Sequence, residues 1–315
     1  MSPARARITR AVAASFAALA IAPLAACGLG EREAHADAIA DGVEAAIAAG
    51  SARGTVSATL RVIEVPDVGV SVGGIAIAVD SADPAELPPF PPIELAMAID
   101  FEHGRSGVQS EAVLQVFDGL DLYGIRHAAA ERDARPWVLL DLEGLDDGDS
   151  GLDPLQDPPL LAMNAISPVV LVDLASGPLT GSIEHRGEET VAGVPATRYE
   201  ANFDIEKVLT KSRRTAYDED RREAVERLFD ALGVKGTVHP GEVWIDEDGL
   251  LRRFDLRLRV EPIRRFAFEV GLRIELTSIG EPVHIDTPAP HELLQIDSLV
   301  AFLRSVVPAP EGGGR

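Results

Sequence analysis

The stretch that decides the fold is LRRFDLRLRVEPIRRFAFEVGLRIELTSI, residues 251–279. In its first part, apolar side chains from Phe254 to Val260 alternate with charged ones, and the same alternation runs from Phe266 to Leu276 in its second part. Strict alternation places the apolar side chains of a strand on one face. The stretch therefore predicts two antiparallel strands with one apolar face, and with charges on the other face that pair across the ladder.

Shorter alternating stretches precede this pair and are separated by turns rich in Gly, Pro and Asp. They predict strands at residues 55–62, 68–79, 93–101, 108–117, 120–125 and 137–142, two strands within 181–203, and one around 243–245. Short turns between consecutive strands favour an antiparallel sheet, because parallel neighbours need long crossovers. Helical spacing of apolar residues predicts helices at 33–49, within 160–174, and at 205–209, 219–232 and 295–306. The pattern predicts an α+β protein.

The composition excludes several classes of protein. The chain has 315 residues, of which 46% are hydrophobic, so it can fold around a sizeable core. Its formal net charge of −22 repels phosphate backbones and makes nucleic acid an unsuitable partner. Its one cysteine allows neither an internal disulfide nor a zinc site of several thiolates.

The N-terminus has the layout of an export signal. Three arginines come first, the apolar run 11–22 follows, and small residues lead to Cys27. The run is shorter than the roughly 20 residues that a spanning helix needs. Leu24-Ala25-Ala26-Cys27 resembles the lipobox of bacterial lipoproteins, in which the cysteine receives acyl chains and the chain is cut before it. Ordinary cleavage that leaves a free thiol is the alternative. We expect acyl chains on Cys27 to hold the folded body at a membrane.

An apolar sheet face of this size must be covered by helices, by a second sheet or by a ligand. The side chains of this sheet face have two possible interpretations: they form a dry packed core, or they line an apolar cavity. The cavity candidates are Leu60, Val62, Leu95, Met97, Ile99, Phe101, Leu114, Val116, Phe254, Leu256, Leu258, Phe268, Val270 and Leu272. Residues 160–174 are the candidate for a mobile lid over this face, with fixed packing as the alternative.

Other kinds of site have little support. The seven histidines lack the spacing of a zinc protease, and no serine lies in a G-x-S-x-G turn. Acidic residues gather in 141–157 without the order of a calcium loop, and a solvated loop is the alternative to a calcium site. Four arginines could contact a lipid phosphate or lie at a solvated helix start: Arg213, Arg214, Arg221 and Arg222. The sequence predicts no catalytic residue, metal or cofactor.

Several motifs resemble those of one family of exported proteins. They are Gly193-Val194-Pro195-Ala196-Thr197-Arg198-Tyr199, Val243-Trp244-Ile245-Asp246 followed by Gly249-Leu250-Leu251-Arg252-Arg253, and Ile285-Asp286-Thr287-Pro288. Together with the N-terminal cysteine and the order of elements, they resemble the LppX/LprG family of actinobacterial lipoproteins and, more widely, the LolA-like lipid carriers. The acidic loop and the strongly negative charge do not map onto the family pattern.

The resemblance implies a curved antiparallel half-barrel sheet whose concave face is covered by helices and encloses a cavity for acyl chains. The chain is then divided into a signal peptide (1–26), the lipidated cysteine and a tether (27–32), one LolA-like lipid-binding domain (33–308) and a flexible tail (309–315). We expect a lipid or lipidated glycan as ligand, carried or presented outside the cytoplasmic membrane, with an envelope transporter as an unidentified partner. A scaffold or adhesion lipoprotein with a filled core and an exported hydrolase are the alternatives.

Overall fold

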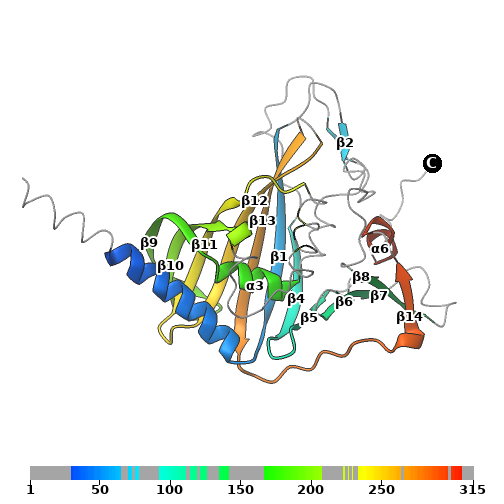
Figure 1. Cartoon of the computed structure of the whole chain (residues 1–315), viewed down its shortest axis with the longest axis horizontal. Helices are drawn as coiled ribbons and strands as arrows, with labels where there is room; N and C mark the ends of the chain where they lie inside the picture. The colour runs from blue at the N-terminus through cyan, green and yellow to red at the C-terminus, as the bar shows by residue number, and fades with distance from the viewer. Residues whose placement is uncertain are drawn as a thin grey trace, which may run out of the picture.

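The computed structural model describes residues 30–64, 70–72, 75–77, 92–110, 114–118, 121–125, 135–141, 167–207, 223, 226, 229, 233–263, 266–296 and 299–306. The described part of the chain is organised around one open sheet of twelve strands (Figure 1). From edge to edge the strand order is β14-β8-β7-β6-β5-β4-β1-β13-β12-β11-β10-β9. Two further short strands, β2 (Val70–Val72) and β3 (Ile75–Ile77), pair with each other in a separate two-stranded sheet.

Neighbouring strands of the large sheet are antiparallel, except for the parallel pair β14 and β8. This confirms the predicted α+β class with an antiparallel sheet. The strands are β1 (Ser51–Glu64), β4 (Ile93–Asp100), β5 (Arg105–Gln109), β6 (Leu114–Asp118), β7 (Asp121–Ile125), β8 (Trp137–Asp141), β9 (Leu179–Val191), β10 (Val194–Asp204), β11 (Val238–Asp246), β12 (Leu251–Ile263), β13 (Phe266–Ile279) and β14 (Leu293–Ile296).

The cross-strand register gives the sheet two chemically different faces. Phe254 lies opposite Ile274, and Ile274 lies opposite Val56, so the apolar residues of β12, β13 and β1 share one face. We call this the inner face. The outer face carries the intervening charged side chains, such as Asp255 opposite Arg273. The alternation in residues 251–279 therefore has the predicted structural consequence.

Helices lie on the inner face (Figure 1). Residues 30–48 are helical and cross the strands toward β11, where a Cβ on Gly42 would meet the side chain of Ile245 at 2.6 Å. Helix α3 (Pro168–Ala175) lies against β4, β5 and β13, and α6 (Leu299–Val306) lies against β7, β8 and β14. A short 3-10 helix, Pro290–Glu292, precedes β14. In the part of the chain that the structure describes, separate helices and not a second sheet cover the inner face.

Three predicted elements were wrong in their extent. The expected strands 68–79 and 108–117 are each two paired strands, β2 with β3 and β5 with β6, because the chain reverses where we expected it to run on. The expected helix 295–306 starts too early: residues 293–296 satisfy their backbone groups by pairing with β8, and the helix begins at Leu299.

Several predicted features lie outside the described residues. They are the signal peptide and Cys27, residues 83–91 of the segment 83–92, whose five prolines predict an exposed loop, residues 142–157 of the acidic stretch, residues 160–166 of the candidate lid, the four arginines at 213, 214, 221 and 222, and the tail 309–315.

Candidate functional site

The inner face of β12 and β13 is continuously apolar and fully covered. Phe254, Leu256, Leu258, Phe268 and Val270 are exposed by 1% of their surface or less. Side chains with so little exposure contact protein on all sides and adjoin no space large enough for water. In this conformation these side chains form a packed core. Their role as the lining of a cavity stays a prediction.

The register brings most of the other cavity candidates to the same face. Leu60 and Val62 of β1 lie opposite residues of β13, and the alternate residues Leu95, Met97 and Ile99 extend the apolar face across β4. These five side chains are exposed by 5% or less. Phe101, just beyond β4, and Leu272 belong to the same cluster or pack against it.

Leu114 and Val116 lie on the opposite face. Gly107 of β5 pairs with Val116, while its neighbour Ser106, opposite Ile99, points to the inner face. The sequence prediction treated 108–117 as one strand, in which 108, 114 and 116 would share a face. Because β5 and β6 form a hairpin, the turn changes which alternate residues face inward. Leu114 and Val116 therefore cannot line the same face as the other candidates.

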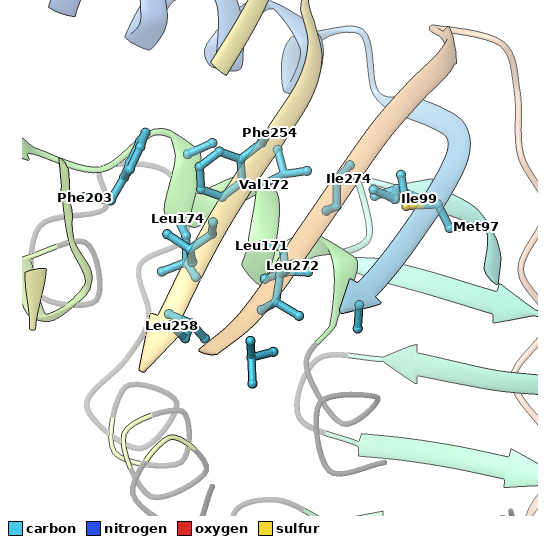
Figure 2. Packing of buried hydrophobic residues seen from close by; sticks show 14 of the residues in the cluster. Met97, Ile99, Leu171, Val172, Leu174, Phe203, Phe254, Leu258, Leu272 and Ile274 are labelled. Carbon is cyan, nitrogen blue, oxygen red and sulfur yellow. The ribbon is translucent and has the colours of Figure 1, made fainter. Parts of the chain in front are cut away.

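Helix α3 supplies the described part of the candidate lid. Leu171, Val172 and Leu174 are exposed by 2% or less, and Figure 2 shows them facing the side chains of Phe254 and Leu272. Its sequence, PVVLVDLA, is apolar almost all round, which is typical of a helix buried on several sides. The helix starts at residue 168 because proline suits the first turn and Ser167 caps it.

The helix of residues 30–48 is held at the β9 edge by a separate set of contacts. Arg32 donates hydrogen bonds to the carbonyls of Gly181 at 2.7 Å and Leu179 at 3.4 Å. The ring of His35 stacks at a tilt against Tyr199 and His185, with centroids 5.4 and 6.1 Å away. Further along the helix, Gly42 permits close packing on β11.

Helix α6 docks on the other half of the inner face. Phe302 and Val306 are buried, and a Cβ added to Gly124 of β7 would collide with both side chains. Only a glycine at this position lets the helix approach so closely. The three helices therefore cover different strands through separate contacts.

The inner face of β5 and β6 carries buried polar groups that the sequence did not reveal. Ser106 and Ser167 are hydrogen-bonded at 3.0 Å between their hydroxyls, and Ser167 also accepts from the N–H of Val169 at 3.2 Å. Gln115 is 1% exposed, and its side-chain carbonyl has no hydrogen-bond partner within the described part of the chain. Such an unpaired buried group costs about 1–3 kcal/mol. Alternation would have placed Gln115 inward only if the turn after Gln109 had been recognised.

On the outer face, a network of charges surrounds Trp244. The guanidinium of Arg253 lies 4.2 Å from the ring centroid and that of Arg198 lies 5.5 Å away, so the indole is only 1% exposed. The indole N–H donates to Glu189 at 3.1 Å. This bond and a second one from Arg198 lower the pKa of Glu189. Arg198 also donates to Glu242 at 2.9 Å.

The same motif includes a buried carboxylate that holds the β11–β12 hairpin. Asp246 accepts hydrogen bonds from the backbone N–H groups of Asp248 and Leu250 at 3.0 and 2.8 Å, and from Arg252 at 2.6 Å. Its side chain is fully buried. The residues of Val243–Asp246 and Gly249–Arg253 that carry the family resemblance therefore act in this structure by closing and bracing a hairpin.

A row of aspartates crosses the outer face of the other half. Asp118 lies opposite Asp121, and Asp121 lies opposite Asp141. Burial, with the charges of Asp141 and Asp118, raises the pKa of Asp121. Tyr123 donates to Asp121 at 3.1 Å, and burial and this carboxylate raise the pKa of Tyr123 to about 12. Within the described ranges, no group of three or more His, Cys, Asp or Glu residues is arranged to hold a metal ion.

The fold and the site together define a class: an α+β protein whose open sheet presents one apolar face to a cover of separate helices. No family model and no curated protein sequence matches the chain. Among solved structures, the chain is similar to the lipoprotein LppX of Mycobacterium tuberculosis, with 14% identity over 81% of this chain and 99% of that one and a TM-score of 0.37.

Two further solved structures are similar in the same way. LprF from Mycobacterium bovis has 11% identity over 81% of this chain and 96% of that one, with a TM-score of 0.37. A putative outer membrane lipoprotein-sorting protein domain from Vibrio parahaemolyticus has 9% identity over 75% and 90%, with a TM-score of 0.25. These matches include lipoproteins of the family that the sequence resembles. Because the TM-scores are below 0.5, the assignment of the fold rests on the strand order and register of the sheet.

Among the described helices, none combines the length and the apolar character needed to cross a bilayer.

Proposed function

We propose that this protein is an exported lipoprotein, anchored through acyl chains on Cys27, that binds a lipid or lipidated glycan noncovalently on the inner face of its sheet. The ligand's acyl chains lie between the sheet and the covering helices. The protein transports or presents this ligand in the cell envelope and catalyses no reaction. The observation that carries the proposal is the continuous apolar inner face of β12, β13, β1 and β4, covered by helices that dock separately.

Separate docking gives the site a route for opening. A second packed sheet would have to move as one unit, whereas α3 covers its strands with one helix of eight residues. Leu171, Val172 and Leu174 occupy the space against β12 and β13 that acyl chains would take. Since the side chains beneath them are already buried, ligand entry requires α3 to be displaced. When acyl chains replace the apolar side chains of α3, the inner face is shielded from water both with and without the ligand.

The membrane anchor rests on the sequence alone. The lipobox-like residues end at Cys27, and the described helix begins at residue 30, only a few residues later. Acyl chains at Cys27 would thus hold the helix of residues 30–48 close to the membrane surface. Because the chain carries a large negative charge, its surface is repelled by anionic headgroups and the acyl chains supply the attachment.

One observation favours a second function. The very low exposure of Phe254, Leu258 and Val270 is also what a permanently filled core would show. In that case the protein is a scaffold or adhesion lipoprotein that uses its outer face, and α3 stays in place.

Two measurements separate these functions. The first is fractionation of the full chain expressed in a bacterium: we expect it in the membrane fraction, and Cys27→Ala in the soluble fraction. The second is organic extraction and native mass spectrometry of the detergent-purified mature protein. The anchor is covalent and stays with the protein, so a stoichiometric lipid in the organic phase is a ligand. A protein that yields no lipid and takes up no fluorescent acyl probe would overturn the carrier function and favour the scaffold.

A further inference from the structure

Gln115 occupies an unusual position on the inner face. The register aligns Val108, Gln115 and Gly124 in one row across β5, β6 and β7, and Met97 and Val138 extend the row to β4 and β8. The other side chains of this row are apolar and at most 5% exposed. An amide therefore points into surroundings that otherwise suit acyl chains.

The side-chain carbonyl of Gln115 has no hydrogen-bond donor among the described residues, which is unusual for a buried polar atom. Oε1 of Gln115 is buried without a hydrogen bond to any described residue. Most buried polar atoms in folded proteins have a partner, and an unpaired one disfavours the folded state. Leucine or methionine at this position would fill the same space without that disadvantage. The unpaired oxygen is suited to accept a hydrogen bond from a group that arrives with a ligand.

A complementary donor lies on the neighbouring strand. Ser106 of β5 is diagonal to Gln115 of β6, close enough on a sheet for side chains to act on a common group. The hydroxyls of Ser106 and Ser167 bond to each other at 3.0 Å. That bond uses one of their two protons, so the pair still has one O–H to donate. The site thus offers one acceptor and one donor within an apolar face.

We propose that Gln115, with Ser106, selects lipids that carry a hydroxyl next to their acyl chains. The hydroxyl donates to Oε1 of Gln115 and accepts from Ser106, whose O–H is available to the ligand once α3 and its cap Ser167 are displaced. Only a group that is both donor and acceptor can make both bonds. This rests on the proposed function, because it places the polar linkage of the bound lipid near β5 and β6, with its chains along the apolar inner face.

The test compares two probes that differ in one proton donor. They are 1,2-dipalmitoylglycerol, which has a free hydroxyl, and its 3-O-methyl ether, which has the same chains and no donor. Binding of each to the mature full-length protein is measured by displacement of a fluorescent acyl probe and by native mass spectrometry. We expect the wild type to bind the hydroxyl lipid at least tenfold more tightly.

The variant Gln115→Met keeps the size of the side chain and removes the acceptor. It should lose the tenfold preference and keep the affinity for the methyl ether. Gln109→Met, on the exposed outer side of β5, is the matched control and should retain the preference. Ser106→Ala removes a donor from which both probe oxygens can accept, so it should weaken the binding of both probes and leave the preference unchanged.

The outcomes are distinct. If the wild type binds both probes equally, or if Gln115→Met retains the preference, the selection by Gln115 is wrong while lipid binding stands. If the wild type binds neither probe nor any other acyl lipid, the proposed function fails, and this proposal fails with it.

Discussion

The two halves of the sheet are built differently. On one side of the centre, β1, β12 and β13 are 13 or 14 residues long, and their inner side chains form one apolar layer. On the other side, β5, β6, β7 and β8 have five residues each. There the inner face includes buried Gln115 and Ser106, the latter bonded to Ser167 at the start of α3, and the outer face includes a row of aspartates.

The charge interactions on the outer face also differ between the two halves. On β12 and β13, Asp255 accepts from Arg253 at 3.0 and 2.8 Å and from Arg273 at 2.9 and 2.8 Å. Burial alone would raise the pKa of Asp255, but these hydrogen bonds outweigh it and lower the pKa. On β7, burial first, and then the neighbouring carboxylates, raise the pKa of Asp121. On the outer face of the long strands, ion pairs therefore lower the pKa of a carboxylate. On that of the short strands, the ion pair of Arg105 with Asp118 at 3.0 Å lies beside a carboxylate whose pKa is raised.

This difference indicates that one half of the sheet mainly stabilises the fold and the other half mainly recognises the ligand. We expect most of the stability in β1 and β9 to β13, where the inner layer is apolar and the outer face carries several ion pairs. Residues that disfavour folding are retained where they serve another purpose, and such departures from local consistency are typical of functional positions. The half formed by β4 to β8 is accordingly the place where we locate recognition of the ligand's polar group.

The largest expected effect comes from breaking the stable half at the β11–β12 hairpin. Asp246→Ala leaves Arg252 and two backbone N–H groups without their acceptor. Loss of one partner of a buried pair costs about 3–5 kcal/mol. We expect urea unfolding to show a loss of this size. Asp248→Ala, at an exposed position two residues on, is the control and should change stability little. Equal stability of the two variants would contradict the role of Asp246.

The next effect tests how tightly the other half is covered. Gly124→Val inserts a side chain where Phe302 and Val306 already lie, and overpacking costs about 1–3 kcal/mol. We expect reduced stability and faster amide hydrogen exchange in 299–306, without faster exchange in β12. Adding Val306→Ala should restore part of the loss.

Gly107→Ala is the matched control for this substitution. A Cβ on Gly107 finds its nearest neighbours at 3.7 and 3.9 Å, which is ordinary contact distance. It should leave exchange in α6 unchanged. If both glycine variants loosen α6 equally, the close approach at Gly124 is not what holds the helix.

The sequence predicted the stable half well and the other half less well, for a physical reason. In β12 and β13 the alternation runs over a dozen residues, and a change of register would turn every apolar side chain outward. In β5 and β6 each strand is only five residues long, so the position of the turn between them determines which side chains face inward. Missing that turn placed Leu114 and Val116 on the wrong face and hid Gln115. The Ser106–Ser167 bond joins residues 61 positions apart and has no local signal.

The smallest effect sharpens the contrast between the outer faces. Asp121→Asn removes one charge from the row of aspartates and keeps an oxygen that can accept from Tyr123. Like charges directly opposite each other in a sheet are unfavourable by a fraction of a kcal/mol, so we expect a gain of about 0.5 kcal/mol at pH 7. Asp255→Asn, which removes the partner of Arg253 and Arg273, should lower stability instead.

The stability gained by Asp121→Asn should depend on pH, and the raised pKa of Asp121 determines the direction of that dependence. The pKa of Asp121 is higher in the folded protein than in the unfolded chain, so its ionised form disfavours folding at neutral pH. As the pH falls through the folded pKa toward the unfolded one, the folded protein takes up the proton and the disadvantage disappears. The gain from Asp121→Asn, measured by urea unfolding between pH 7 and pH 3, should therefore vanish at the acid end. A gain that persists unchanged at pH 3 would show that the charge of Asp121 is not its cause, and would remove the aspartate row from the contrast between the two halves.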